Sequence, residues 1–385
     1  MSKSIVIAGS LAQKPRQGGH TWVFLQYLLG FRRLGWDVLF LDRLDPGMCV
    51  DEAGRPSSFE DSLNLRYFQE VMHGFGLSDA FSLDYNRGEY VVGLPRQRVL
   101  ERARNSAFLL NVMGFLTDEE VMSCAPRRVF LDIDPGFGQM WRELGLHNLF
   151  HGHDEYVTIG ENIGRADCAI PLCGLNWITS PQPIILDYWP AVGAVGDWFT
   201  SIATWRGSYG PLEYMGKTYG LRVHEFRKFV TLPLRSGRPF QLALDIHSAE
   251  AKDRALLDAN RWSVVDPLVV AGDPWAYQAY IQGSKAEFMV AKNMYVQTNC
   301  GWFSDRSICY LASGKPVLAQ DTGLERLVPT GTGLLTFTTL EEAGAGVEEL
   351  SRDYVRHARA ARALAEECFD SDKVLKRLLG KLAVA

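Results

Sequence analysis

The chain has 385 residues, of which 47% are hydrophobic and 22% charged, and its net charge is −5. Such a length exceeds one typical core and predicts two domains of about 150–200 residues, while the acidic balance argues against a nucleic-acid partner, which normally meets a basic face. No apolar stretch approaches the length of a membrane span, so we expect no integral membrane segment.

The cysteines and the first residues favour a cytoplasmic protein. Seven cysteines stand at positions 49, 124, 168, 173, 300, 309 and 368, and no two of them form a CxxC pair. Free thiols in a reducing compartment are the expected result. The opening MSKSIVIAGS runs directly into a strand, without a charged segment and a long apolar segment, so no signal peptide is predicted. The sequence does not indicate an oligomeric state.

The first half begins with a βαβ unit. Residues 5–8 form a short apolar run typical of a strand buried on both faces. Residues 20–34 carry apolar side chains at helical spacing, and Gly35 ends that helix. The next strand is predicted at 38–41. Strand, helix and strand in this order predict a parallel sheet.

The rest of the first half is less regular. Residues 45–66 are polar and irregular, and a short helix is predicted at 99–104. Strands are predicted at 108–112, 129–131 and 156–159. Between 171 and 198 the composition shifts, with prolines at 171, 181, 183 and 190. We interpret this stretch as the crossing between domains.

The second half repeats the same order of elements. Strands are predicted at 199–204, 241–246, 263–265 and 287–291, and helices at 219–228, 253–259 and 275–281. Residues 341–379 form a long, charge-rich helical tail. The whole is therefore an α/β protein with a parallel sheet in each half.

The segment 301–323, GWFSDRSICYLASGKPVLAQDTG, combines a glycine turn, a helix, a strand and a second polar turn. Ser304 is a good N-cap, and Asp305 follows where a helix favours an acid. Gly314 and Pro316 end the helix, which is predicted at 305–313, before a strand at 317–319.

Two loops of this segment are expected to converge on an anion. Asp321-Thr322-Gly323 leaves the carboxyl end of the strand, and the turn at 301–304 is predicted to follow another strand end of the same sheet. A helix N-terminus beside glycine suits a diphosphate, and the Arg306 guanidinium can add two charge-assisted hydrogen bonds. The alternative is an ordinary turn with a solvent-facing Asp–Arg pair.

Residues 305–323, together with Gly331-Thr332-Gly333-Leu334-Leu335, resemble the donor-binding region of group 1 glycosyltransferases. The resemblance covers about 100 residues well. It implies the GT-B fold: two Rossmann-like domains facing across a cleft, with domains at 1–185 and 186–362 and a final helix at 363–385 that packs back toward the first. Retaining members carry two Glu eight positions apart here; residues 301–310 contain no Glu, and Asp305 is a partial substitute.

The start of the first helix suggests the catalytic base. Gly18-Gly19-His20-Thr21, followed by the GWDV at 35–38, resembles the "G-H … G-H-x-V" opening of nucleotide-sugar glycosyltransferases of this fold. In inverting members the His at this place is the general base, which suits an imidazole. The alternative is a helix-cap residue without chemistry. Asp132 is the competing base or the group that orients it, and Asp134 is interpreted as a helix N-cap.

Two basic residues extend the predicted donor site. The Arg206-Gly207-Ser208 turn has the position of a phosphate loop, and Lys228 can reach a phosphate, although it shares a helical face with Glu225 and a solvated pair is the alternative. The sequence thus predicts catalytic His20 and Asp132, and donor-binding Gly18, Gly19, Arg206, Ser208, Lys228, Ser304, Asp305, Arg306, Asp321, Thr322 and Gly323.

No metal site or cofactor is predicted beyond the nucleotide-diphosphate sugar as co-substrate. His151 and His153 lack the spacing of a helical His pair, and the D-x-D letters at 132–134 lie in the acceptor half and run into Pro135. The resemblance implies a glycosyltransferase acting on a hydroxyl of a small-molecule or glycan acceptor. The alternative is a nucleotide-sugar-binding protein or an epimerase on the same scaffold.

Overall fold

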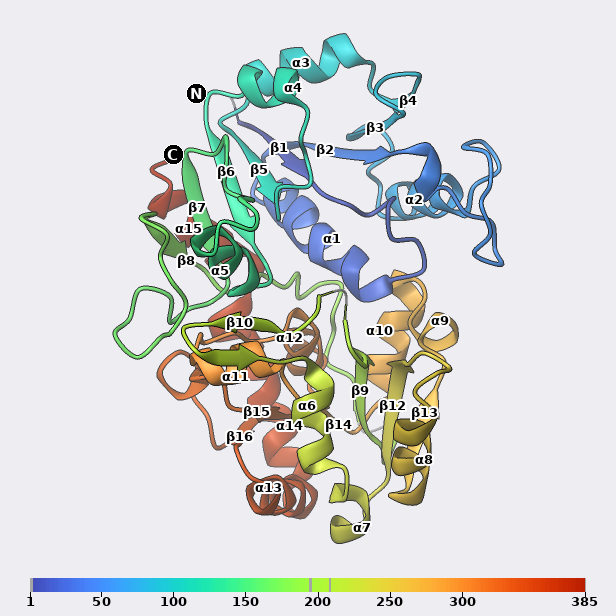
Figure 1. The fold of residues 1–385 in the computed structure, drawn as a ribbon, viewed down its shortest axis with the longest axis vertical. Helices are drawn as coiled ribbons and strands as arrows, with labels where there is room; N and C mark the ends of the chain where they lie inside the picture. Colours follow the sequence, from blue (N-terminus) through green and yellow to red (C-terminus); the bar gives the residue numbers. More distant parts are fainter. Residues whose placement is uncertain (1–2, 194–195, 208, 385) are drawn as a thin grey trace.

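The computed structural model describes residues 3–193, 196–207 and 209–384, which form two α/β halves stacked on one another (Figure 1). The first half contains an eight-stranded sheet of order β4-β3-β2-β1-β5-β6-β7-β8. Its strands are β1 (Ser4–Ala8), β2 (Asp37–Leu44), β3 (Phe81–Tyr85), β4 (Tyr90–Gly93), β5 (Phe108–Val112), β6 (Arg128–Asp132), β7 (Glu155–Thr158) and β8 (Trp177–Thr179).

This sheet is parallel except at one edge, where β4 pairs antiparallel with β3. The central strand β1 is buried along its whole length between β2 and β5, as its apolar run predicts. The accompanying helices are α1 (Gly18–Arg33), the short η1 (Pro46–Met48), α2 (Leu63–Gly74), α3 (Arg96–Arg104), α4 (Glu119–Cys124) and α5 (Phe137–Glu143).

The second half contains a fully parallel six-stranded sheet of order β13-β12-β9-β14-β15-β16. Its strands are β9 (Phe199–Thr204), β12 (Phe240–Asp245), β13 (Trp262–Val265), β14 (Ala286–Met289), β15 (Val317–Gln320) and β16 (Leu334–Phe337). A separate hairpin is formed by β10 (Leu212–Tyr214) and β11 (Lys217–Tyr219). The prediction of an α/β fold with two Rossmann-like halves is confirmed.

Helices cover both faces of the second sheet and return the chain to the first half (Figure 1). They are α6 (Arg222–Phe226), η2 (Arg227–Phe229), α7 (Leu232–Ser236), α8 (Ala251–Ala259), α9 (Pro267–Val270), α10 (Pro274–Gly283), α11 (Asn293–Thr298), α12 (Asp305–Ala312), η3 (Leu324–Arg326), α13 (Leu340–Arg352), α14 (Tyr354–Leu364), the π-helical η4 (Ala365–Phe369) and α15 (Ser371–Lys381). None of the helices in the described ranges is long and apolar enough to cross a bilayer.

The chain crosses between the halves twice, and the two crossings pair with each other. The Ile184 amide donates to the Phe369 carbonyl at 2.8 Å, and the Ser371 amide donates to the Ile184 carbonyl at 2.9 Å. Beyond this point α15 packs against α1. One buried apolar cluster continues from the first half into the second, so the halves are joined by a shared core.

Three expectations about elements are wrong. Residues 45–66 are not irregular throughout, because Ser62 caps α2 by accepting a hydrogen bond from the Leu65 amide. The helix predicted at 219–228 starts only at Arg222. The residues before it form a hairpin, whose two-residue turn places both Met215 and Gly216 at positive φ, as the twist of adjoining strands favours.

The predicted tail helix is divided into separate helices. Asp353 accepts a hydrogen bond from the Arg356 amide and starts α14, and Asp370 accepts one from the Asp372 amide and starts α15. Both caps lie within a charge-rich run, where an N-cap Asp cannot be distinguished by composition from any other surface acid. The breaks let the chain turn back across the junction between the halves.

Candidate active site in the interdomain cleft

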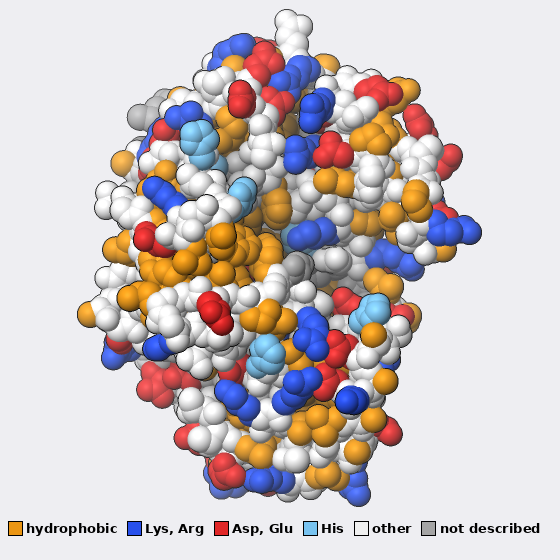
Figure 2. Space-filling model, viewed as in Figure 1, with side chains coloured by type: hydrophobic (Ala, Val, Ile, Leu, Met, Phe, Trp, Pro, Cys, Tyr) orange, Lys and Arg blue, Asp and Glu red, His pale blue; other side chains and the backbone are white. Residues whose placement is uncertain are grey.

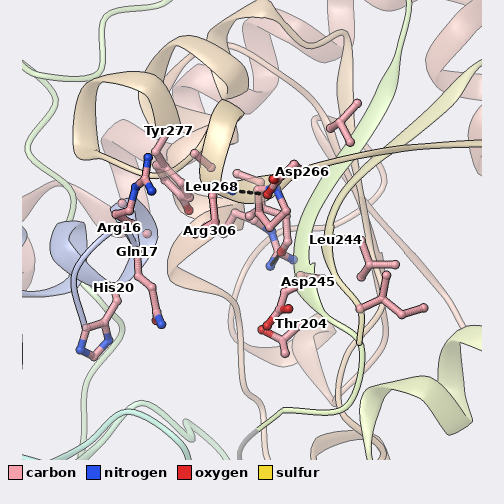
Figure 3. Close-up of a pocket in the computed structure, with 18 of the residues that line it drawn as sticks. Arg16, Gln17, His20, Thr204, Leu244, Asp245, Asp266, Leu268, Tyr277 and Arg306 are labelled. Atoms are coloured by element: carbon pink, nitrogen blue, oxygen red, sulfur yellow. Dashed lines mark hydrogen bonds between the residues drawn. The ribbon is translucent and has the colours of Figure 1, made fainter. Parts of the chain in front are cut away.

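A cavity of about 680 Å³ lies between the two halves. Residues 16–20 of the first half form one wall, and the ends of β9 and β12, helix α9 and the start of α12 form the other (Figure 3). At the level where the halves meet, an apolar area lies over α5 and β10, while Lys and Arg side chains are distributed over both halves (Figure 2). The cleft is thus lined by loops at the carboxyl ends of strands, where open α/β sheets bind ligands.

Four guanidinium groups line this cavity, from Arg16, Arg222, Arg254 and Arg306. Arg222 differs from the others, because within the described residues it forms no ion pair and no hydrogen bond, and its Nε is buried without a partner. Burial and the neighbouring Arg306 lower the pKa of Arg222 to about 10. A buried donor without a partner is costly, and a bound anion would satisfy it.

Arg306 is anchored from behind. It is only 7% exposed, and its Nε donates to the carboxylate of Glu287, a β14 residue with 0% exposure. Its Nη1 donates to the Ile202 carbonyl at 2.7 Å. Glu287 and the Ile202 carbonyl therefore hold the Arg306 guanidinium in one orientation in the cleft wall, while its Nη2 donates to no partner within the described residues and is left for a ligand.

The start of α12 is built as predicted. The Ser304 hydroxyl accepts a hydrogen bond from the Arg306 amide at 3.2 Å. Ser304 is buried and does not line the cavity, whereas Asp305 does. Burial raises the pKa of the Asp305 carboxyl. Asp305 therefore places a carboxyl group at the edge of the arginine cluster.

His20 lines the cavity from the first turn of α1. Its Nε2 lies 3.0 Å from the Ser10 hydroxyl and 3.2 Å from the Ser10 carbonyl oxygen. Because a carbonyl can only accept, Nε2 carries the proton and Nδ1 is left as the basic nitrogen. Burial, followed by the charge of Lys14, lowers the pKa of His20 to about 3. The side chain bonds to Ser10, so it does not act as a helix cap.

Asp132 is buried away from this cavity. It is 2% exposed, and its Oδ2 accepts from Gln139 Nε2 at 2.7 Å and from the Thr158 hydroxyl at 3.0 Å. Its Oδ1 accepts from the Asp134 amide. Burial raises the pKa of Asp132 to about 6. With its oxygens occupied, Asp132 holds the loop after β6 together and has no path to a ligand in this cleft.

Asp134 joins the two halves and does not cap a helix. Its carboxylate accepts from Lys292 Nζ at 2.5 Å and also from the Tyr295 hydroxyl. The helix that follows starts after Gly136, whose positive φ of 111° suits glycine. The Asp134 side chain therefore contributes a contact across the domain interface.

The two loops at 301–304 and 321–323 do converge, but on each other. The Gly301 amide donates to the Thr322 carbonyl at 2.7 Å, and the Thr322 hydroxyl donates to the Trp302 carbonyl at 2.6 Å. Asp321 Oδ1 accepts from the amide of Gly323. Asn162 of the first half donates to the Gly323 carbonyl at 3.1 Å. The polar groups of the two loops therefore bond to other protein groups, and neither loop lines the cavity.

Arg206 and Lys228 also lie outside the cavity. Arg206 pairs with Glu250 at the surface. Lys228 donates to Glu225 at 2.7 Å, which is the helical pair considered as the alternative. Ser208, the third member of the predicted phosphate loop, lies outside the described residues. The basic residues that sequence motifs indicated are thus neutralised by neighbouring carboxylates.

The glycines before His20 allow a close approach of protein to protein. The Gly18 amide donates to the Ala271 carbonyl at 3.0 Å. A Cβ at Gly18 would stand 2.3 Å from the Asp273 carbonyl oxygen, and one at Gly19 would stand 2.8 Å from the Tyr277 ring. Both glycines line the cavity. Their lack of a side chain lets the start of α1 pack closely against the second half, and this packing explains the glycines without a ligand.

We expect Gly18→Ala to destabilise the protein by about 1–3 kcal/mol, because backbone must move to admit the methyl group. Urea unfolding measures this change. Gly47→Ala is the control, since a Cβ there would meet nothing within 4 Å. Equal stabilities of the two variants would show that the contact between α1 and the loop at 271–273 is not tight.

Sequence reasoning missed Arg16, Arg222 and Arg254. None stands in a glycine-rich motif, and Arg222 begins α6 directly after the β10-β11 hairpin, which the sequence analysis did not predict. Among the described residues, no three His, Cys, Asp or Glu side chains converge in a way that could hold a metal ion. The described cleft is therefore a cationic site with one neutral imidazole.

Two doubly wound sheets facing across such a cleft, with the last helix returned to the first half, define the GT-B fold, and the prediction of this fold is confirmed by comparison with solved structures. No family model matches the chain, and no curated protein matches it.

Structural neighbours match over the full length. An α-glucosyltransferase in complex with UDP and a 13-mer DNA has 13% identity and a TM-score of 0.59, with 99% of each chain covered. Anabaena HepE in complex with UDP-glucose has 11% identity and a TM-score of 0.56, with 99% of each chain covered. Sucrose-phosphate synthase from Thermosynechococcus elongatus has 11% identity and a TM-score of 0.52, with coverage of 99% of this chain and 98% of that one. At these identities the likeness defines the fold.

Proposed function

We propose that this protein is a glycosyltransferase that moves a sugar from a nucleotide-diphosphate sugar to a hydroxyl of a small-molecule or glycan acceptor, without a metal ion. The observation that carries the proposal is the unpaired Arg222 beside the anchored Arg306 in the interdomain cleft. Two guanidinium groups at one point suit a diphosphate, which is both the bound group and the leaving group. The solved complexes with UDP or UDP-glucose on the same fold support this choice of ligand.

In the proposed reaction, His20 Nδ1 accepts the proton of the acceptor hydroxyl as its oxygen bonds to the anomeric carbon. The bond between that carbon and the diphosphate oxygen breaks at the same time. Arg222 and Arg306 stabilise the negative charge that develops on the diphosphate. The lack of a Glu in residues 301–310 supports direct displacement. The lowered pKa makes the His20 ring a weak base in the free protein, and the negative charge of a bound diphosphate would raise that pKa and so strengthen the base.

We propose an acceptor other than nucleic acid. Two of the structural neighbours were solved with DNA, but this chain has a net charge of −5, whereas nucleic-acid binding normally requires a broad basic surface.

Arg222→Ala tests the donor site. We expect UDP binding to weaken by about 1.5–3 kcal/mol, which is roughly 10–150-fold, because a charge-assisted contact is lost. Stability should change little, since Arg222 has no partner in the described structure to leave unpaired. Calorimetric titration of UDP measures the effect, and Arg206→Ala is the control, since that arginine pairs with Glu250 outside the cavity. Undiminished UDP affinity in the Arg222 variant would remove this arginine from the site.

Turnover separates transfer from its alternatives. A glycosyltransferase releases UDP from UDP-glucose faster when an acceptor hydroxyl is supplied. An epimerase converts the sugar nucleotide without acceptor, and a binding protein does neither. Binding of UDP with no release across a panel of glycan and small-molecule acceptors would favour the binding protein.

A further inference from the structure

A second cavity of about 690 Å³ lies in the first half, bordered by β2, β3, α3 and α4. It does not share any lining residue with the interdomain cleft. Its volume is within the range of small-molecule sites. Neither the donor nor the base of the proposed reaction uses it.

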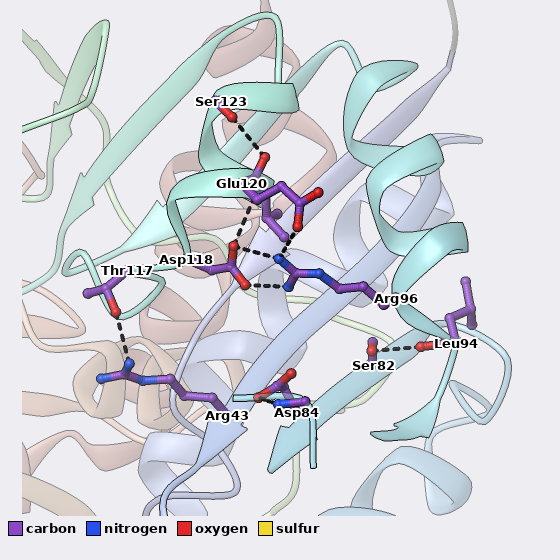
Figure 4. Close-up of polar contacts among 11 residues, drawn as sticks. Arg43, Ser82, Asp84, Leu94, Arg96, Thr117, Asp118, Glu120 and Ser123 are labelled. Atoms are coloured by element: carbon purple, nitrogen blue, oxygen red, sulfur yellow. Dashed lines mark hydrogen bonds and ion pairs between the residues drawn. The ribbon is translucent and has the colours of Figure 1, made fainter. Parts of the chain in front are cut away.

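One side of this cavity is a fixed polar frame (Figure 4). Arg96 donates to Asp118 at 2.9 Å and to Glu120 at 2.7 Å. Asp118 also accepts from the Val121 amide and so caps α4. These contacts hold α3 and α4 in place, and the wall they form does not depend on a ligand.

The other charged side chains around the cavity are not paired. Within the described residues, Arg43, Arg87, Asp45, Asp84 and Glu119 form no ion pair, although charges of both signs surround the same space. Arg43 donates one hydrogen bond, to the Thr117 hydroxyl at 2.8 Å, and its Nε is buried without a partner. Asp84 accepts from the Gly88 amide through one oxygen. The cavity therefore presents both free donors and free acceptors.

The balance of charge selects the kind of ligand. Five carboxylates line the cavity against three guanidinium groups, and Asp42 is a sixth carboxyl group whose pKa burial raises to about 7. The cavity therefore favours a cation and disfavours phosphate, in contrast to the arginine-rich cleft. No three of the described acidic side chains are placed to hold a metal ion, which favours an extended cation. Arg43 and Arg87 require acceptor groups on the ligand, and a simple polyamine has none when protonated. Val91, Val99 and Leu116 offer apolar contact to C–H groups.

We propose that this cavity binds a polyhydroxylated amine, such as an amino sugar or an aminocyclitol. Its ammonium group would lie among Asp45, Asp84 and Glu119, and its hydroxyls would accept from Arg43 and Arg87. This inference does not depend on the proposed transferase activity, because binding at this site needs neither donor nor base.

The test is a binding series with one variable charge. Glucosamine, glucose, glucose 6-phosphate and spermidine are titrated by NMR line broadening or calorimetry at a pH where the amines are charged. We expect glucosamine to bind at about 1 mM or tighter, and at least about tenfold more tightly than glucose, with glucose 6-phosphate weakest. Asp84→Asn and Glu119→Gln should each weaken glucosamine binding by about tenfold.

Two controls keep the result specific. Asp79→Asn changes an exposed acid that does not line the cavity and should leave glucosamine binding unaltered. The urea-unfolding midpoint should stay unchanged in every variant, which reports an intact fold. Three outcomes would overturn the proposal: tighter binding of glucose 6-phosphate, spermidine binding equal to that of glucosamine, or glucosamine binding that neither acidic variant weakens. No detectable glucosamine binding at about 10 mM would also overturn it.

Discussion

Arg306→Ala is expected to destabilise the fold by about 3–5 kcal/mol, in addition to any effect on donor binding, because it leaves a buried charge without its partner. The partner, Glu287, has 0% exposure, and its second oxygen already lacks a hydrogen bond. This expectation differs from that for a solvent-facing Asp–Arg pair, whose loss would spare the fold. Urea unfolding of the variant, with a two-state fit, measures the change.

The pH dependence identifies Glu287 as the cause. Burial raises the pKa of Glu287, and removal of Arg306 raises it further, so the folded variant prefers the neutral carboxyl. A group whose folded pKa exceeds its unfolded pKa stabilises at low pH and loses that stability as pH rises. The variant should therefore lose most stability above neutrality and less near pH 5.

Two comparison variants complete this experiment. Arg306→Ala combined with Glu287→Gln should recover part of the lost stability, since no charge is left buried. Arg206→Ala, which breaks an exposed ion pair with Glu250, should cost less than about 1 kcal/mol. If Arg306→Ala and Arg206→Ala lower the free energy of unfolding by equal, small amounts, then Glu287 is solvated or compensated in solution. The contribution of Arg306 would then be to ligand binding and not to stability.

The general fold could be predicted because short apolar strands alternate with helices in each half, and this order permits few topologies. Capping signals also placed α12 closely, since Ser304, Gly314 and Pro316 act within a few residues of one another. The hairpin β10-β11 and the divided tail were missed, because their signals, a positive-φ turn and two N-cap acids, are common in surface sequence.

The residues that line the interdomain cleft were predicted only in part, and the reason lies in long-range pairing. A strand end followed by Asp321-Thr322-Gly323 indicates a loop at the ligand edge, but the sequence does not show that Asn162, from the other half, covers it. Similarly, the sequence indicates that Lys228 could reach a phosphate, but in the structure its ammonium group pairs with the Glu225 carboxylate. Arg222 has no motif around it, and only tertiary structure shows that nothing within the described residues pairs with it.

His20→Ala is expected to lower turnover by about 100-fold or more, the usual contribution of a general base, while UDP affinity changes by less than about twofold. The imidazole lines the cleft from α1, and Arg222 and Arg306, which are proposed to hold the diphosphate, belong to the second half. Initial rates of UDP release with acceptor present, together with UDP titration, separate the two effects.

The pH–rate profile gives a sharper expectation. Because the pKa of His20 is lowered to about 3, the ring stays neutral through the physiological range. Protonation of His20 should therefore not produce an acidic limb near its ordinary pKa, and kcat/KM should stay level between about pH 5 and 8 as far as His20 controls it. An acidic limb centred near pH 6.5 that disappears in His20→Ala would show that the ring is hydrated in the working enzyme.

Ser10→Ala and Asp132→Asn test which side chain accepts the proton of the acceptor hydroxyl. Ser10→Ala keeps the carbonyl that fixes the His20 tautomer, so turnover should fall by no more than about tenfold. Asp132→Asn should act mainly on stability, because an amide has only one acceptor oxygen. It cannot accept all the hydrogen bonds that Asp134, Gln139 and Thr158 now donate to the two carboxylate oxygens. Near-normal turnover in His20→Ala, with turnover abolished in a folded Asp132→Asn protein, would assign the base to Asp132. It would also require the loop after β6 to rearrange when the acceptor binds.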